Sequence, residues 1–381
     1  MIKSSVIPVA GLAVILALGT AASAAQPVMT AARAPVRHRP VTAYVVGVSN
    51  GVTPIRIATN TAGKTIRVGN FPLAIAVTPD GRTVYVASWI NILKHVRGTV
   101  TPIRTATNTA GKPIRVGTGP IAIAITPNGK TAYVWNATSG SITPINTATN
   151  TAGRPIKGGG PLAITRNSKT AYIVSGLDTV SPLRTATNTP GKPIKVGREP
   201  FHAAITPDGR TLYVASEINV NKPVRGTVTP IDTATNRPGR AISVGIGPDA
   251  IAITPDGKTV YVVNLGSGTV TPIRTATNTA GKPIKVGGLP YAIAITPSGG
   301  TAYVVSDRSG TVTPIDTATN IAGRPIRVGA GPQDIAITPD GKTAYVTSFD
   351  TNTVTPIKTA TNAALRPIRV GFEPELIVIT P

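Results

Sequence analysis

The chain offers few side chains suited to covalent or metal chemistry. It contains no cysteine, which excludes disulfides, thiolate metal sites and a cysteine nucleophile. Its three histidines, His38, His95 and His202, are too few and too scattered for a centre built from several imidazoles. No G-x-S-x-G, H-E-x-x-H or phosphate-cradling motif is present. Any catalysis would therefore depend on carboxylates and one histidine as general acids or bases.

One set of polar residues stands out against a repetitive background. Except for Glu373, which precedes the proline, they lie one or two residues after the proline of a recurring G-x-x-P phrase, where other copies carry Leu, Ile or Ala. We take them as a candidate ligand site: His202, Asp249, Tyr291, Asp334, Glu373 and Glu375, with Arg198 and Glu199 alongside. Carboxylates of this number suit a divalent cation such as calcium or a cationic ligand, although nothing in the sequence demands a cofactor. The alternative is that these are loop positions that drifted to polar residues.

The second charged feature is an excess of cations. Lys and Arg number 38 against 15 Asp and Glu, a formal net charge of +23. Many of them lie in turns expected on the face opposite the candidate ligand site, and a basic surface of this size attracts polyanions. The candidate polymer-binding residues are Lys64, Lys112, Arg154, Lys192, Arg240, Lys282, Arg324 and Arg366. The partners considered are wall glycopolymers, acidic lipid surfaces and DNA. DNA would be bound without recognition of its base sequence, because no recognition helix is expected. The alternative is that the positive charge only keeps the protein soluble.

An internal repeat must position both features. The phrase TPIxTATN occurs six times, with the variants TPIRIATN at residues 53–60 and SPLRTATN at residues 181–188, at intervals near 42 residues. Eight of the nine tyrosines follow the same period. In residues 248–287, four short β-branched runs alternate with Pro-Asp-Gly, Gly-Ser-Gly and Asn-Thr-Ala-Gly turns. Four strands per 42 residues predict a β-propeller blade. The proline in every third strand predicts a bulge or a lost pairing there, and the repeated tyrosines predict packing between blades.

The two ends of the repeat region complement each other. Residues 43–48 form a second strand without a first, and residues 375–380 form a first strand with nothing after it. Their pairing would complete one blade from both termini and remove two exposed sheet edges. The sequence therefore predicts an all-β, eight-bladed propeller over residues 43–381.

The repeat text also resembles a known family. TAYVVN, TAYVTS, ITPDGKT and IDTATN are similar to the repeats of the YVTN-type β-propellers, and the resemblance covers about residues 43–381. It implies a secreted or surface-layer propeller, commonly with seven blades, so a seven-bladed ring is the alternative. The chain departs from the pattern at the acid of IDTATN, which only Asp232 and Asp316 keep. The fold itself does not specify an activity.

The N-terminus has the features of an export signal. Lys3 precedes an apolar stretch over residues 6–19 and an Ala-Ser-Ala cleavage motif at 22–24. We expect a signal peptide at 1–25, a flexible linker at 26–42, and a mature chain without a transmembrane segment, located outside the cytoplasm (extracellular, wall or periplasm). An uncleaved anchor is the alternative.

These observations favour a non-enzymatic binding or scaffold protein of the cell envelope. The alternatives are a lactonase- or lyase-type propeller enzyme using the candidate carboxylates, and a structural surface-layer component. Two expanded loops, residues 88–98 and 216–226, are candidate contacts for a protein partner.

Overall fold

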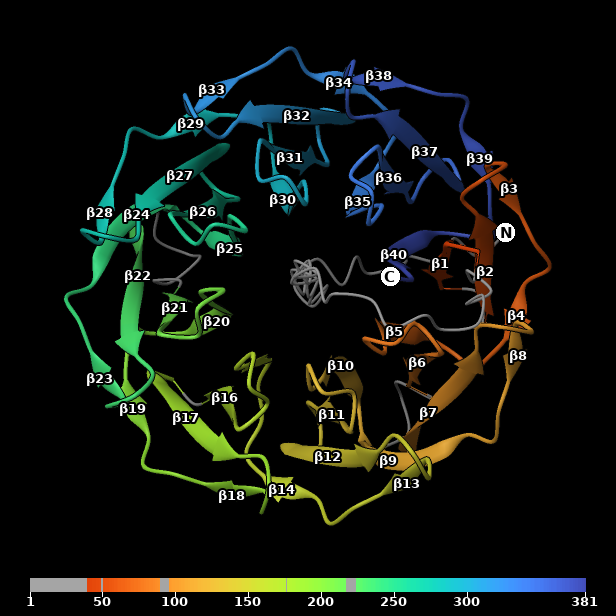
Figure 1. Ribbon diagram of the computed structural model, residues 1–381, viewed down its shortest axis with the longest axis horizontal. Coiled ribbons are helices and arrows are strands. Elements are labelled where there is room, and N and C mark those ends of the chain that lie inside the picture. The colour runs from red at the N-terminus through yellow and green to blue at the C-terminus, as the bar shows by residue number, and fades with distance from the viewer. Residues whose placement is uncertain (1–39, 49–50, 90–95, 176, 217–223) are drawn as a thin grey trace, which may run out of the picture.

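The repeats fold as eight antiparallel sheets set like blades around a central axis (Figure 1). The computed structural model describes residues 40–48, 51–89, 96–175, 177–216 and 224–381, and the expected signal peptide and most of the two expanded loops lie outside these ranges. All regular elements in the described ranges are strands. Each blade has four strand positions, the outermost of which is split in two. The eight-bladed prediction is confirmed.

The strands occupy the same four positions in every blade. The innermost strands are β5 (Pro72–Val77), β10 (Pro120–Ile125), β15 (Leu162–Ile164), β20 (Pro200–Ile205), β25 (Pro248–Ile253), β30 (Pro290–Ile295), β35 (Pro332–Ile337) and β40 (Pro374–Ile379). The second strands are β6 (Thr83–Ser88), β11 (Thr131–Asn136), β16 (Thr170–Ser175), β21 (Thr211–Ser216), β26 (Thr259–Asn264), β31 (Thr301–Ser306), β36 (Thr343–Ser348) and β1 (Thr42–Gly47). The third strands are β7 (Arg97–Arg104), β12 (Ser141–Asn146), β17 (Thr179–Arg184), β22 (Arg225–Asp232), β27 (Thr269–Arg274), β32 (Thr311–Asp316), β37 (Thr353–Lys358) and β2 (Gly51–Arg56).

Each outer strand is a pair of short segments that pair with the same third strand. These pairs are β8 (Thr109–Ala110) and β9 (Ile114–Thr118), β13 (Thr151–Ala152) and β14 (Ile156–Lys157), β18 (Thr189–Pro190) and β19 (Ile194–Lys195), β23 (Arg237–Pro238) and β24 (Ile242–Ile246), β28 (Thr279–Ala280) and β29 (Ile284–Lys285), β33 (Ile321–Ala322) and β34 (Ile326–Arg327), β38 (Ala363–Ala364) and β39 (Ile368–Arg369), and β3 (Thr61–Ala62) and β4 (Ile66–Arg67). We number the blades 1 to 7 from β5–β9 to β35–β39; the eighth, the closure blade, contains β40 and β1–β4.

The closure blade joins the two ends of the chain. The C-terminal strand β40 pairs antiparallel with β1, with Ala43 opposite Ile379 and Val46 opposite Leu376 (Figure 1). The backbone N–H of Thr380 donates to the carbonyl of Thr42 at 3.0 Å. The complementary ends therefore complete one blade, as the sequence predicts.

The proline of each third strand does not interrupt the inner ladder. Tyr44 lies opposite Pro54 in an unbroken register between β1 and β2. The carbonyl of Pro54 accepts from the N–H of Gly63 at 2.7 Å, so this residue's polar groups face the outer strand. Proline has no N–H to donate to the outer strand, so the outer strand splits into β3 and β4 at this point. The equivalent hydrogen bond to the proline carbonyl recurs in the other blades. The predicted disturbance is present, but on the outer neighbour.

The hydrophobic core consists of eight layers, each between two adjacent blades. In one such layer, Tyr85 and Val100 of blade 1 pack against Val134 and Ile145 of blade 2. The tyrosines are almost fully buried, and burial raises the pKa of each hydroxyl to about 12. This confirms packing between blades as their role.

Each of these tyrosine hydroxyls also donates to an asparagine of the next blade. Tyr44 bonds Asn108 at 2.6 Å, Tyr213 bonds Asn278 at 2.6 Å, and the series closes where Tyr345 bonds Asn60 at 2.5 Å. Such asparagines end the TATN phrases and have positive φ, a conformation that asparagine tolerates better than most residues. Hydrogen bonds therefore connect every pair of neighbouring blades.

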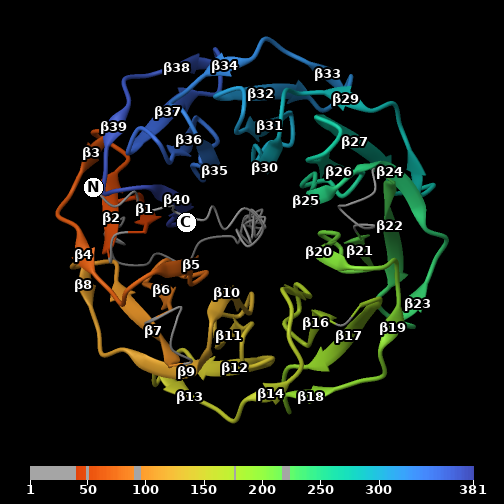
Figure 2. The ribbon, with the colours of Figure 1, turned by 180° about the vertical axis from the view of Figure 1, so that it is seen from behind.

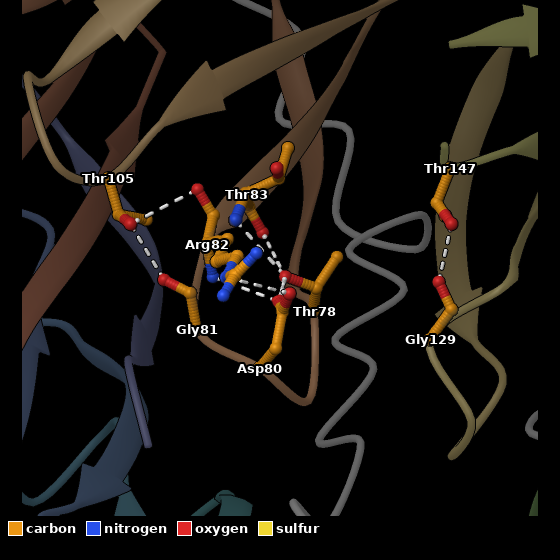
Figure 3. A network of polar contacts seen from close by, with 8 residues as sticks. All are labelled: Thr78, Asp80, Gly81, Arg82, Thr83, Thr105, Gly129 and Thr147. Carbon is orange, nitrogen blue, oxygen red and sulfur yellow. Dashed lines mark hydrogen bonds and ion pairs between the residues drawn. The ribbon is translucent and has the colours of Figure 1, made fainter. Parts of the chain in front are cut away.

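The hairpin turns are fixed by short polar contacts (Figure 3). Asp80 accepts from the Thr78 hydroxyl at 2.6 Å and from the N–H of Arg82 at 3.0 Å. The Thr105 hydroxyl, from the TATN turn of the same blade, donates to the carbonyl of Gly81 at 2.7 Å. The first-to-second and third-to-outer turns therefore share one face of the ring, the hairpin face. The loops entering the innermost strands lie on the opposite face, the mouth face.

Candidate functional site

The innermost strands, which lie nearest the axis of the ring (Figure 1), contain five of the six candidate ligand residues. Asp249, Tyr291 and Glu375 occupy the second position of β25, β30 and β40 and are partly exposed. His202 and Asp334 occupy the third position of β20 and β35 and are buried. Glu373 is exposed on the loop before β40. The structure thus separates the set into channel-facing and interior groups.

The channel-facing groups lie near one another. Tyr291, from blade 6, packs against the apolar cluster between the closure blade and blade 1. Burial, followed by the charges of Asp249, Glu375 and Asp307, raises the pKa of the Tyr291 hydroxyl. Burial, together with the nearby charge of Glu373, raises the pKa of Glu375 to about 7. The mouth therefore holds a phenol that stays protonated and a carboxyl that titrates near neutrality.

Asp334 does not face the channel as a ligand group would. Its Oδ2 accepts from the N–H of Ile377 in β40 at 3.0 Å, and its Oδ1 accepts from the N–H of Ile335 at 2.8 Å. The hydroxyl of Thr347 accepts from the N–H of Asp334 and donates to the carbonyl of Glu375 at 3.1 Å. Burial raises the pKa of Asp334 to about 7, although the two N–H donors oppose that shift. We infer that Asp334 links blade 7 to the C-terminal strand.

His202 is likewise engaged by the backbone. Its Nδ1 contacts the carbonyl oxygen of Asp249 in the next blade, and a carbonyl only accepts, so Nδ1 carries the proton. Within the described residues, no group of three or more His, Asp or Glu side chains is arranged to hold a metal ion. Arg198 and Glu199 lie on the loop that enters β20, and Glu199 has positive φ.

The candidate polymer-binding cations lie on the outer rim, and not on the hairpin face where the sequence placed them. Lys64 lies between β3 and β4, and both views show the outer strands on the circumference (Figures 1 and 2). In seven blades a second cation follows three residues later. We call these fifteen exposed residues the basic belt: Lys64, Arg67, Lys112, Arg115, Arg154, Lys157, Lys192, Lys195, Arg240, Lys282, Lys285, Arg324, Arg327, Arg366 and Arg369. The second cations were missed as site residues because the sequence does not show that the outer strand is a bulged edge.

The belt cations differ electrostatically from those on the hairpin face. At four hairpin turns a cation pairs with the turn aspartate, as Lys258 does with Asp256 at 3.4 Å. Along the belt, Lys195 pairs with Asp178 at 3.8 Å, and it is the only belt residue in an ion pair within the described ranges. The belt therefore presents largely uncompensated positive charge in every blade.

The comparisons with known proteins agree with the fold. The model of the family "Lactonase, 7-bladed beta-propeller" matches residues 176–320. The chain is similar to a hydrazine synthase chain of Kuenenia stuttgartiensis, with 24% identity over 76% of this chain and 96% of that one and a TM-score of 0.62. It is also similar to the dihydro-heme d1 dehydrogenase NirN (15% identity, 92% and 77% coverage, TM-score 0.75). A third similar structure is a putative 6-phosphogluconolactonase of Bacteroides fragilis (18% identity, 91% and 100% coverage, TM-score 0.59).

These likenesses define a β-propeller and no particular activity, because all three structures share less than 25% identity with this chain. No curated protein matches the chain. The described residues contain no helix that is long and apolar enough to cross a membrane.

Proposed function

We propose that this protein is a non-catalytic binding protein that holds a flexible anionic polymer along its basic belt. The observation that carries the proposal is the recurrence of exposed, mostly unpaired cations at matching positions of every outer strand. Repeated cations along a continuous surface bind polyanions by releasing their counterions, without recognising a sequence of units. No cofactor is needed. The export signal expected at residues 1–25 supports a location outside the cytoplasm, where wall glycopolymers are available.

The shape of the belt favours a flexible chain over a stiff or flat partner. A convex rim meets a flat lipid surface over few blades at a time. Duplex DNA has a persistence length of about 150 base pairs, and bending it around a small protein costs several kcal/mol. A flexible linear polyanion can follow the rim and reach the cations of several neighbouring blades.

A salt titration of binding to linear polyphosphate tests the proposal. We expect affinity to fall steeply with salt, with a slope of roughly 0.7 per neutralised charge for a flexible strand. A variant in which Lys64, Lys112, Lys282 and Arg324 become Gln should lower that slope by up to about 3, which follows from the same relation. Duplex DNA and anionic vesicles should bind more weakly than polyphosphate.

The matched control removes the same charge from the hairpin face. Changing Lys130, Lys169, Lys258 and Lys342 to Gln lowers the net charge equally but leaves the belt intact. If both variants lower the salt dependence of binding equally, only the net charge matters. Binding that does not change with salt concentration would contradict the proposal outright.

A catalytic function at the mouth is the second candidate. It is favoured by the match of residues 176–320 to the lactonase family model and by the Glu375 carboxyl, which titrates near neutrality beside Tyr291. If the mouth hydrolyses a lactone, Glu375→Gln should lower kcat at least 100-fold while belt substitutions leave it unchanged. A screen of lactones that finds no turnover above a Glu375→Gln control would end this candidate.

A further inference from the structure

A cleft lies beside the basic belt at blade 7. The cleft has a volume of about 300 Å³ and lies between blades 6 and 7. Arg327 and Gly329 contribute to it from blade 6, and Thr351, Thr355 and Leu365 from blade 7.

One wall of the cleft exists because a single residue departs from the repeat. The half-buried Leu365 occupies the outer-strand bulge, where the other seven blades have glycine. Its N–H donates to the carbonyl of Pro356 at 2.8 Å, as the N–H of Gly323 does to Pro314 at 2.7 Å in blade 6. The backbone is therefore unchanged, and the leucine adds only an apolar surface to the cleft.

The cleft also includes a hydroxyl without a partner. Thr355 is 1% exposed, and no described atom bonds its Oγ1. The equivalent hydroxyl in blade 5, Thr271, accepts from the side-chain amide of Asn264 at 2.9 Å. Blade 7 has Ser348 in place of that asparagine, and its hydroxyl is also buried and unpartnered within the described structure. A buried hydroxyl without a hydrogen bond is unfavourable, so a water or a ligand hydroxyl is expected to satisfy Thr355.

The remaining groups define what such a ligand looks like. Arg327 is an exposed belt cation outside every described ion pair. The hydroxyls of Thr351 and Thr353 lie 2.8 Å apart along the cleft. A cation, several hydroxyls and an apolar wall match a sugar ring that carries a carboxylate or phosphate.

We propose that this cleft binds one acidic sugar unit of the polymer held by the belt. Arg327 pairs with the anionic substituent, the threonine hydroxyls bond the sugar hydroxyls, and Leu365 packs against the apolar face of the ring. This inference rests on the proposed function and narrows its polymer to an acidic glycan.

Titration of single sugars, followed by NMR or calorimetry, tests the cleft separately from the belt. Glucuronic acid and glucose 1-phosphate are the probes, and glucose and inorganic phosphate are the comparators. We expect saturable binding of both acidic sugars, at least tenfold tighter than that of either comparator. Arg327→Gln should weaken the acidic sugars tenfold or more, while Leu365→Gly and Thr355→Val should each weaken them at least threefold.

The control is Thr229→Val, which changes another buried threonine hydroxyl that has no partner among the described residues and lies away from this cleft. It should leave sugar binding unchanged, and Leu365→Gly, which restores the residue of the other blades, guards against loss of folding. The inference would be overturned if acidic sugars bind no better than glucose, or if Leu365→Gly and Thr355→Val leave their binding unchanged. Water would then be the partner of Thr355. The proposed function would then still stand if polyphosphate binding depends on salt and on the belt. It would fail on its own if sugars bind but the belt variant keeps the full salt slope.

Discussion

Removing the C-terminal strand should open the ring. Deleting residues 374–381 leaves β1 with one exposed edge and removes the inner strand of the closure blade. It also removes the N–H of Ile377, which donates a hydrogen bond to Oδ2 of Asp334. The core layers on both sides of the closure blade lose members, since Leu376 belongs to one layer and Ile377 and Ile379 to the other.

The expected loss is large relative to typical stabilities. Leu376, Ile377 and Ile379 are 6%, 3% and 6% exposed, and burying each such side chain contributes about 1.5–3 kcal/mol, or roughly 5–9 kcal/mol together. The lost ladder bonds and the unpaired Asp334 carboxyl add to this. Native domains are stable by only about 5–15 kcal/mol, so the truncated chain should aggregate or melt far below the full chain.

Thermal unfolding followed by circular dichroism, with light scattering for aggregation, measures this effect. A synthetic peptide of residues 373–381 added in trans should restore stability in proportion to its concentration, because it binds only the folded ring. A peptide in which Leu376 and Ile377 are replaced by Ser is the control and should not rescue. A truncated protein that stays soluble and melts within 2 °C of the full chain would refute the closure argument.

Two further predictions concern buried polar groups. The pKa values of Asp334 and Glu375 are raised to about 7, so their protonation stabilises the fold fully below about pH 4, and this contribution is lost as the pH rises through 7. Asp334→Asn should therefore flatten the fall in melting temperature between pH 5 and 8. An unchanged pH profile would count against a buried, titrating Asp334. Tyr345→Phe removes the hydrogen bond to Asn60 that closes the blade series, and it should lower the free energy of unfolding by about 1 kcal/mol, measured by chemical denaturation. Tyr213→Phe removes the equivalent bond between two blades within the series and should lower it by about the same amount. A far larger loss for Tyr345→Phe would mean that ring closure depends on that one bond.

The fold could be predicted because the repeat specifies it many times over. Each copy gives the same strands, turns and buried tyrosine, and the complementary ends fix the number of blades. The partner of each tyrosine hydroxyl could not be predicted, because Tyr85 and Asn150 lie 65 residues apart and only the packing of neighbouring blades joins them.

The candidate site was predicted less completely. The repeat placed Asp249, Tyr291 and Glu375 at the channel, since their position in the innermost strand is shared by every blade. It could not show that Asp334, one position further along its strand, turns inward to bond β40, because only the three-dimensional register reveals this. The role of the cations as a binding set stays a prediction. They were placed on the wrong surface, because the sequence assigned them to the turn between the third and outer strands and did not show that they lie within the split outer strand.

Lysine reactivity in the presence of polyphosphate tests the central claim most directly. Acetylation rates are measured by mass spectrometry for belt lysines Lys64, Lys112, Lys192 and Lys282 and for hairpin-face lysines Lys130, Lys169, Lys258 and Lys342, with and without the polymer. Our account predicts that polyphosphate protects the belt lysines severalfold at low salt, that protection disappears at high salt, and that hairpin-face lysines change little. Protection of the hairpin-face lysines with the belt lysines left reactive would contradict it.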